Sequence, residues 1–239
     1  MKVMNKPTLL ILHGWGCDKS VYSDLVAFLE PRYNVVLPEL PGFGATPEPP
    51  EPWGVYEYAE YVADLCDREG IIPDVLFCHS LGCRIATVLL SGEIGYNMSP
   101  RKVIFTGAAG IRPKQTLRQK LRTRLFKISR VLLRPSPEKL EAMRQKYGSA
   151  DYRSATPMMR QCLVKIVNLD LTELFMEVKN DTLLIWGGND DSTPLSDGYL
   201  MECLMPGAGL AVIEGAGHYA FLEQPALFKK ILNSYLGGN

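Results

Sequence analysis

The ten residues 75–84 combine two periodicities, and this combination constrains the fold more than any other feature of the chain. Residues 75–78 form a short apolar run, which is typical of a strand buried on both faces. From Leu81 onward, apolar residues recur at the spacing of a helix. Ser80 and Gly82 lie where one pattern changes into the other. The stretch therefore predicts a buried strand that turns sharply into a helix at Ser80.

A strand that passes into a helix through the pattern x-Ser-x-Gly forms a nucleophile elbow. The tight turn presents the hydroxyl of Ser80 at the carboxyl end of the sheet, and free N–H groups at the start of the helix suit a developing negative charge. We expect Gly82 where the strand and helix backbones pass too close for a side chain. The usual first glycine of the motif is replaced by Cys78, which is also small. A serine that only caps a helix would fit the same pattern. Whether Ser80 is a nucleophile therefore depends on whether other loops supply a base, an acid and an oxyanion donor.

The rest of the chain alternates short apolar runs with helical patterns. Strands are predicted at residues 8–12, 33–37, 102–106, 182–186 and 210–213. Helices are predicted from the capping residues 18–20 to about 29, and at 55–69, 195–204 and 225–236. Strands this apolar indicate an α/β fold, with a mostly parallel central sheet and helices on both faces. Ligands of such sheets bind at the carboxyl ends of the strands.

The alternation stops between residues 111 and 180. An apolar stripe at helical spacing is formed by Leu117, Leu121, Leu125, Ile128 and Leu132. The charged residues around it, from Arg112 to Arg134, are all basic. Further helices are predicted to begin at Ser136 and to cover about 158–169. We therefore predict a helical cap, or lid, at residues 111–180, inserted into a core formed by residues 1–110 and 181–239.

Composition adds limits on location and partners. The formal net charge is zero, so the whole chain has no general attraction to nucleic acid or to a membrane surface. The six cysteines form no C-x-x-C pair, which favours reduced thiols in a reducing compartment. No apolar run approaches the length of a membrane span, and no metal-ligand spacing is visible. We expect a cytoplasmic protein without metal, cofactor or nucleic-acid partner.

Four loops that follow predicted strands carry residues with possible catalytic roles. In chain order they supply a glycine-rich loop, a serine, a carboxylate and a histidine. These four loops are residues 13–17, 78–82, 187–191 and 215–218, and residues 41–44 form a fifth, turn-rich loop. The order Ser, Asp, His is that of one serine hydrolase fold and differs from two others. On these five loops the chain resembles the α/β-hydrolase superfamily, and within it small bacterial carboxylesterases with a helical lid. The resemblance covers about residues 8–236, apart from the cap.

The resemblance implies a role for each member of a triad. Serine is a poor nucleophile at neutral pH and needs an adjacent base. His218 would take the proton of Ser80 and return it to the leaving group. A carboxylate must hold the imidazole in the correct tautomer, and the superfamily places this acid at the position of Asp190. Spacing alone leaves the neighbouring Asp191 as an alternative.

The resemblance also implies an oxyanion hole formed by the backbone N–H groups of Trp15 and Leu81. Three aromatic residues, Trp15, Phe43 and Tyr219, are candidates for substrate binding, although ordinary packing would explain each of them. His79 precedes the nucleophile and is expected to point away from it into the interior.

The reaction expected from these residues is hydrolysis of a small-molecule carboxylic ester through an acyl-enzyme on Ser80. A carbon–carbon bond hydrolase or lactonase with the same triad is an alternative, and so is a non-catalytic receptor of the same fold. Haloalkane dehalogenases and epoxide hydrolases of the superfamily use aspartate as the nucleophile, so serine argues against both. The basic residues 112–134 are either a solvated face or a site for an anionic substrate or an acidic carrier protein.

Overall fold

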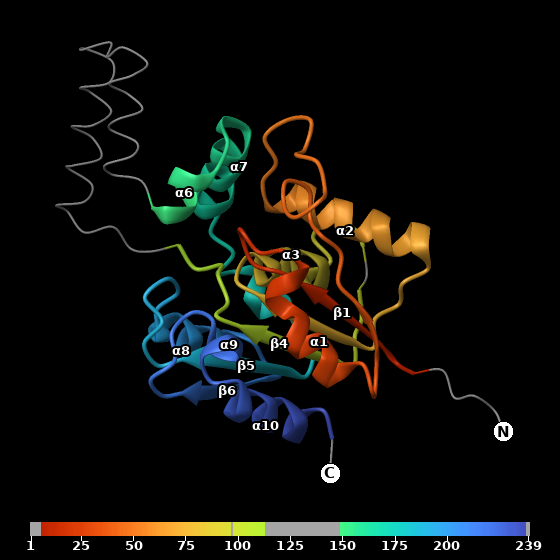
Figure 1. Ribbon diagram of the computed structural model, residues 1–239, viewed down its shortest axis with the longest axis vertical. Coiled ribbons are helices and arrows are strands. Elements are labelled where there is room, and N and C mark those ends of the chain that lie inside the picture. The colour runs from red at the N-terminus through yellow and green to blue at the C-terminus, as the bar shows by residue number, and fades with distance from the viewer. Residues whose placement is uncertain (1–5, 97, 113–148, 238–239) are drawn as a thin grey trace.

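The computed structural model describes residues 6–96, 98–112 and 149–237 (Figure 1). In this part of the chain, six strands form one sheet in the order β2-β1-β3-β4-β5-β6, and every neighbouring pair is parallel. The strands are β1 (Thr8–Leu12), β2 (Asn34–Val36), β3 (Val75–His79), β4 (Lys102–Thr106), β5 (Thr182–Gly187) and β6 (Ala208–Ile213). The predicted α/β class is confirmed, and β2 is shorter than predicted because only three of its residues pair with β1.

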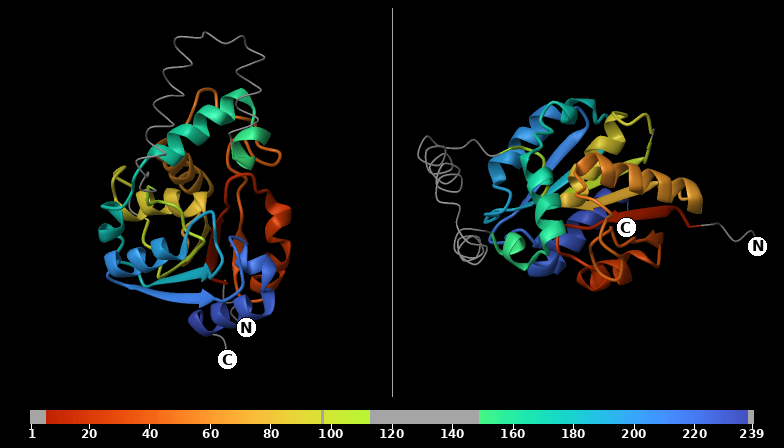
Figure 2. Two further views of the ribbon diagram at one scale, coloured as in Figure 1. Left: turned by 90° about the vertical axis from the view of Figure 1, so that its left-hand side faces the viewer. Right: turned by 90° about the horizontal axis from the view of Figure 1, so that it is seen from above.

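Helices cover both faces of this sheet, as the views in Figures 1 and 2 show together. One face carries α2 (Val55–Glu69), α3 (Leu81–Ser91) and α8 (Leu195–Leu204), and the other carries α1 (Ser23–Leu29), α9 (Ala220–Glu223) and α10 (Pro225–Tyr235). A 3-10 helix, η1 (Lys19–Tyr22), precedes α1, and the side chain of Asp18 caps it by accepting from the N–H of Ser20. α2 ends at Gly70, whose φ of 64° lies in the left-handed region that favours glycine.

Alternate residues of the central strands enter two separate apolar clusters. In β3, Leu76 and Cys78 belong to the cluster beneath α2 and α3. Val75 and Phe77 belong to the cluster on the opposite face, with α1 and α10. Both faces of β3 are therefore buried, which explains the apolar run in its sequence.

The predicted cap is described only in part. Its described residues contain α6 (Ala150–Ser154), α7 (Pro157–Asn168) and a 3-10 helix, η2 (Leu174–Glu177), and none of them is in a strand. α6 and α7 lie side by side in Figures 1 and 2. The apolar stripe from Leu117 to Leu132 and the helix predicted to begin at Ser136 lie outside the described residues. The division into core and cap remains a prediction.

The described residues contain neither a candidate membrane-spanning helix nor a candidate metal site. No helix there is both long enough and apolar enough to cross a membrane. No group of histidine, cysteine and acidic side chains in the same residues is arranged to hold a metal ion. All six cysteines are free thiols, and all except Cys203 are buried.

Candidate active site

Ser80 occupies the sharp turn between β3 and α3. Its φ of 50° is the only positive φ of a non-glycine residue in the described part of the chain. An L-residue is strained in this conformation, which places the side chain outside the regular paths of strand and helix. The strain is held by the packing around the turn: a Cβ on Gly82 would lie 2.1 Å from the carbonyl oxygen of Leu12. Gly82 thus lets α3 approach the backbone of β1, as predicted.

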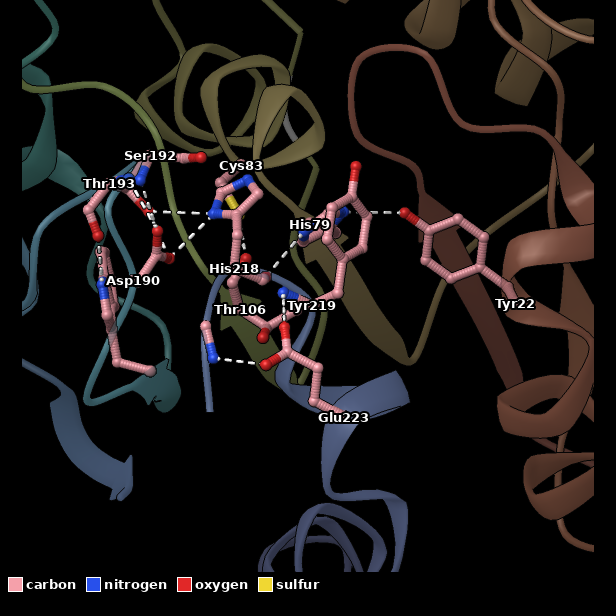
Figure 3. Close-up of polar contacts among 12 residues, drawn as sticks. Tyr22, His79, Cys83, Thr106, Asp190, Ser192, Thr193, His218, Tyr219 and Glu223 are labelled. Carbon is pink, nitrogen blue, oxygen red and sulfur yellow. Dashed lines mark hydrogen bonds and ion pairs between the residues drawn. The ribbon is translucent and has the colours of Figure 1, made fainter. Parts of the chain in front are cut away.

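Two loops at neighbouring strand ends bring Asp190 and His218 together (Figure 3). Asp190 follows β5 and His218 follows β6, and Nδ1 of His218 lies 2.8 Å from Oδ2 of Asp190. The carboxylate of Asp190 is buried, with 6% of its residue surface exposed. The rival carboxylate, Asp191, is exposed, and the hydrogen bond and ion pair of the imidazole are formed with Asp190. The structure therefore brings Asp190, and not Asp191, to His218.

Every oxygen of the Asp190 carboxylate accepts hydrogen bonds. The backbone N–H groups of Ser192 and Thr193 donate to Oδ1 over 2.9 Å each. The hydroxyl of Thr193 donates to Oδ2 over 2.8 Å, beside the bond from His218. Burial by itself would raise the pKa of Asp190, but the bonds from His218 and Thr193 outweigh it and hold this pKa below its ordinary value. Asp190 is therefore a carboxylate at neutral pH, and Nδ1 of His218 carries a proton. The other ring nitrogen, Nε2, is left with a lone pair and can act as a base.

Glu223 fixes the loop that carries His218. Its carboxylate accepts the N–H of Gly217 over 2.7 Å and the N–H of Tyr219 over 3.1 Å, so it holds the residues on both sides of His218 (Figure 3). Glu223 is the last residue of the short helix α9. The histidine thus has a fixed backbone as well as a fixed ring.

A buried chain of hydrogen bonds connects the loop after β1 with the loop of His218. The N–H of Gly14 donates to the hydroxyl of Tyr22 over 3.0 Å, and this hydroxyl lies 3.0 Å from Nδ1 of His79. Nε2 of His79 lies 3.3 Å from the carbonyl oxygen of His218. A carbonyl can only accept, so Nε2 of His79 carries the proton and Nδ1 accepts from Tyr22. The chain runs in one direction from Gly14 to His218.

His79 is neutral in this chain. It is fully buried, and burial together with the nearby His218 lowers its pKa to about 3. His79 is not available as a base, because both of its ring nitrogens already form hydrogen bonds. Its hydrogen bonds agree with the expected interior position, but His79 also lines the cavity beside Ser80, and its ring lies 4.9 Å from that of His218, between centroids.

The glycine-rich loop after β1 is braced by His13. The N–H of Leu40 donates to Nε2 of His13 over 2.9 Å, so the proton of this ring is on Nδ1 and is donated to the carbonyl of Gly14 over 2.8 Å. In the described residues, the backbone N–H groups of Trp15 and Leu81, the predicted oxyanion donors, are not bonded to any acceptor.

Phe43 packs against the glycine-rich loop after β1. It is buried, and its ring packs edge-on against His13 and Trp15, at centroid distances of 5.4 and 5.0 Å. Trp15 and Tyr219 line the cavity beside Ser80, whereas Phe43 is not among the described residues that line it. Phe43 therefore supports the loop of His13 and Trp15 by ring packing, which is one of the two explanations that the sequence leaves open.

A cavity of about 430 Å³ lies beside Ser80 and His218. Ser80, Leu81, His218 and Trp15 line it on the side of the sheet. The opposite side is formed by residues of the predicted cap: residues 149–151 and three apolar residues of α7, namely Leu163, Ile166 and Val167. The cavity is large enough for a small organic ligand.

Sequence reasoning missed four residues of this site: Tyr22, Thr193 and Glu223, whose bonds are described above, and Arg84, which lines the cavity. Each acts through a contact with a residue far away in the sequence or through a loop geometry, and none belongs to a recognisable motif. Only Thr193 had a weak local signal, because a hydroxyl residue shortly after an aspartate is typical of a turn closed by that aspartate.

Several known proteins are similar to this chain in sequence or in structure. A family model described as "Alpha/beta hydrolase family" matches residues 9–231. A pimeloyl-[acyl-carrier protein] methyl ester esterase of Legionella pneumophila is 24% identical over 95% of this chain and 94% of its own length. An esterase structure from Exiguobacterium antarcticum superposes with a TM-score of 0.75 at 20% identity, covering 98% of this chain and 93% of that one. A meta-cleavage product hydrolase from Pseudomonas fluorescens gives a TM-score of 0.71 at 19% identity, with coverages of 98% and 91%.

Proposed function

The chain belongs to the alpha/beta hydrolase family, and from this premise we propose that it hydrolyses carboxylic esters through an acyl-enzyme formed on Ser80. The observation that carries the proposal is the pair of Asp190 and His218, 2.8 Å apart, at the wall of a cavity that Ser80 also lines. Curated relatives named as methyl ester esterases favour an ester over a carbon–carbon bond as the substrate.

In the first half of the proposed reaction, Nε2 of His218 removes the hydroxyl proton of Ser80 as Oγ attacks the ester carbonyl. The negative charge that develops on the carbonyl oxygen is stabilised by the N–H groups of Trp15 and Leu81. Asp190 stabilises the imidazolium that forms, without becoming protonated itself. The tetrahedral intermediate then breaks its bond to the alcohol oxygen, and His218 gives the proton to the leaving alcohol.

In the second half, a water molecule takes the place of the alcohol. His218 removes a proton from this water, and the resulting hydroxide attacks the acyl carbon on Ser80. The new tetrahedral intermediate expels Oγ of Ser80, which recovers its proton from His218. The products are a carboxylic acid and an alcohol, and the enzyme returns to its starting state.

The test is turnover of p-nitrophenyl acetate and butyrate by the wild type and by Ser80→Ala. Removing the nucleophile of a serine hydrolase lowers kcat by about 10⁶-fold. The control is Ser196→Ala, at an exposed serine of α8, which should leave turnover unchanged. Equal turnover by Ser80→Ala and the wild type would sink the mechanism. Tight binding of esters without any turnover by the wild type would instead favour a receptor.

A carrier-linked ester is a second candidate substrate. It is favoured by the name of the Legionella relative, which specifies an acyl-carrier-protein-linked methyl ester, and by the basic residues between Arg112 and Arg134. Apart from Arg112, these residues lie outside the described part of the chain, so the argument rests on their charge alone. Acyl carrier proteins are acidic, and opposite charges raise the rate of encounter.

Neutralising Arg118, Lys120, Arg122 and Arg124 together should raise KM for a carrier-linked ester and leave KM for p-nitrophenyl butyrate unchanged. Equal kinetics of the variant and the wild type on both substrates would remove this candidate.

We place the reaction in the cytoplasm, since the cysteines near the site are free and buried.

A further inference from the structure

Arg84 is a buried cation in the wall of the cavity, and the proposed mechanism does not use it. It lies on α3, four residues after Ser80, which is a rise of about 6 Å along a helix. It lines the same cavity as Ser80 and His218, although only 5% of its residue surface is exposed. A charged side chain in this position is costly unless something pairs with it.

Arg84 has no ion-pair partner in the described residues. Burial lowers its pKa to about 10, so the guanidinium stays charged at neutral pH. Asp170 raises this pKa electrostatically but forms no ion pair with the guanidinium, and its Oδ1 accepts from the N–H and hydroxyl of Thr172. Removing a cation from water without a paired anion is unfavourable, so a free anion near Arg84 would be stabilised.

The structural role of Arg84 uses only part of its guanidinium. Nη1 donates over 2.9 Å to the carbonyl of Leu169, the residue that ends α7. A guanidinium has five N–H donors. The remaining nitrogens have no hydrogen-bond partner in the described residues, and they are not among the fully buried unpaired atoms found there. They therefore keep some accessible surface, and Arg84 is one of the residues that line the cavity.

We propose that Arg84 binds a carboxylate of the substrate, so that half-esters of short dicarboxylic acids are preferred over neutral esters. This inference rests on the proposed function, because it assigns the substrate class of the same cavity. A guanidinium and a carboxylate match as planar, bidentate partners. One helical turn separates Arg84 from Ser80, so only a few carbons can lie between the ester carbonyl and the carboxylate.

Two acidic residues that line the same cavity favour one orientation of such a substrate. Asp151 comes from α6 and Asp197 from α8, whereas Arg84 comes from α3. Burial and the charge of Asp190 raise the pKa of Asp197. Both acidic groups repel a second carboxylate, and the wall formed by Arg84 is left as the place for it. A carrier-linked ester differs, because its negative charge lies on the carrier and outside the cavity.

The test compares two ethyl esters of the same length, monoethyl glutarate and ethyl 4-carbamoylbutanoate, which differ only in a carboxylate against a neutral amide. Ethanol release gives kcat and KM for the wild type, Arg84→Gln and Arg84→Lys, with Arg68→Gln at an exposed position of α2 as the matched control. One charge-assisted hydrogen-bonded pair corresponds to a change of about 10- to 100-fold. Arg84→Gln should lose this factor in kcat/KM for the half-ester, mainly through KM, and change little on the amide. Arg84→Lys should retain part of the preference, and Arg68→Gln all of it.

Equal losses on both esters in Arg84→Gln, or a wild type that does not distinguish them, would overturn the role of Arg84 while leaving ester hydrolysis intact. Failure of the wild type to hydrolyse any ester would overturn the proposed function instead. Titration with glutarate reads the carboxylate site without turnover and also serves if Arg84→Gln folds poorly. Glutarate should bind the wild type and compete with the neutral ester, whereas glutaramide should not. Equal effects of the two compounds would contradict the inference.

Discussion

Oδ2 of Asp190 lies 2.8 Å from Nδ1 of His218, and this contact determines which ring nitrogen is available as a base. The other oxygen of the carboxylate is fully engaged by the backbone N–H groups of Ser192 and Thr193. Each oxygen of Asp190 therefore has its own task. Oδ1 holds the loop after β5, and Oδ2 holds the imidazole and also accepts from the hydroxyl of Thr193.

Asp190→Asn should reverse the tautomer of His218. The two backbone donors require an oxygen at the position of Oδ1, so the new amide would place its NH₂ group against Nδ1. This nitrogen would then accept, and the proton would move to Nε2, which could no longer act as a base. We expect a loss of kcat of about 10⁴-fold with little change in KM. Asp191→Asn, at an exposed position, is the control and should behave as the wild type. A loss confined to Asp191→Asn would assign the acid to that residue.

Tyr22→Phe should break the chain between Gly14 and His218. It leaves the N–H of Gly14 and Nδ1 of His79 without their partner, and an unsatisfied buried polar group costs about 1–3 kcal/mol of stability. We also expect kcat to fall more than KM rises, because the chain joins the oxyanion loop to the histidine loop.

Tyr58→Phe is the matched control for Tyr22→Phe. Its hydroxyl is also buried and donates over 2.8 Å to the carbonyl of Pro41, but it has no part in the His79 chain. This variant should lose stability, measured by chemical denaturation, with a smaller change in kcat. Identical kinetics in the two variants would show that the chain has only a structural role.

Gly82→Ala should destabilise the elbow. The added Cβ would meet the carbonyl oxygen of Leu12 at 2.1 Å, and a backbone atom cannot rotate away. Overpacking of this kind costs about 3 kcal/mol or more, which corresponds to a fall in Tm of about 10 °C for a domain of this size. Gly209→Ala in β6 is the control, because a Cβ there has no atom within 4 Å. A wild-type Tm for Gly82→Ala would contradict the close approach of α3 and β1.

Stability should fall as the pH is lowered from 7 to 5. His79 has a pKa of about 3 in the folded protein, against an ordinary value of 6.5 for a histidine in the unfolded chain. Below pH 6.5 the unfolded chain therefore binds a proton that the folded protein does not, and unfolding becomes easier. The contribution of His79 between pH 7 and pH 5 is about 2 kcal/mol. His79→Gln should flatten the pH dependence of the free energy of unfolding by this amount. The lowered pKa of Asp190 acts in a more acidic range, since its stabilisation is lost only as the pH falls through that pKa. An unchanged slope in His79→Gln would mean that His79 is not held neutral.

The strands and helices were accessible from local patterns. Residues 102–106 and 195–204 are β4 and α8 with the predicted boundaries, because an apolar run and a helical repeat each act over a few neighbouring residues. The short helix α9 was missed, since four residues are too few to show a period.

The choice between Asp190 and Asp191 needed tertiary structure. Two adjacent carboxylates have nearly the same sequence context, and only their orientation differs. The N–H of Asn189 donates over 2.8 Å to the carbonyl of Ala216, and this bond ties the loop after β5 to the loop that carries His218. The tie turns Asp190 inward and leaves its neighbour in solvent.

The sequence by itself determined the α/β class, the serine at the turn and the order of the loops, because these depend on residues that are close together in the chain. Tertiary structure decided that Phe43 supports a loop, that Tyr22 and His79 connect two loops, and that Arg84 faces the cavity. Tyr22 and His79 are 57 residues apart, and no local pattern records such a contact. Burial, hydrogen-bond partners and charge environment are properties of the packed molecule, since they depend on which strand ends the parallel sheet places together.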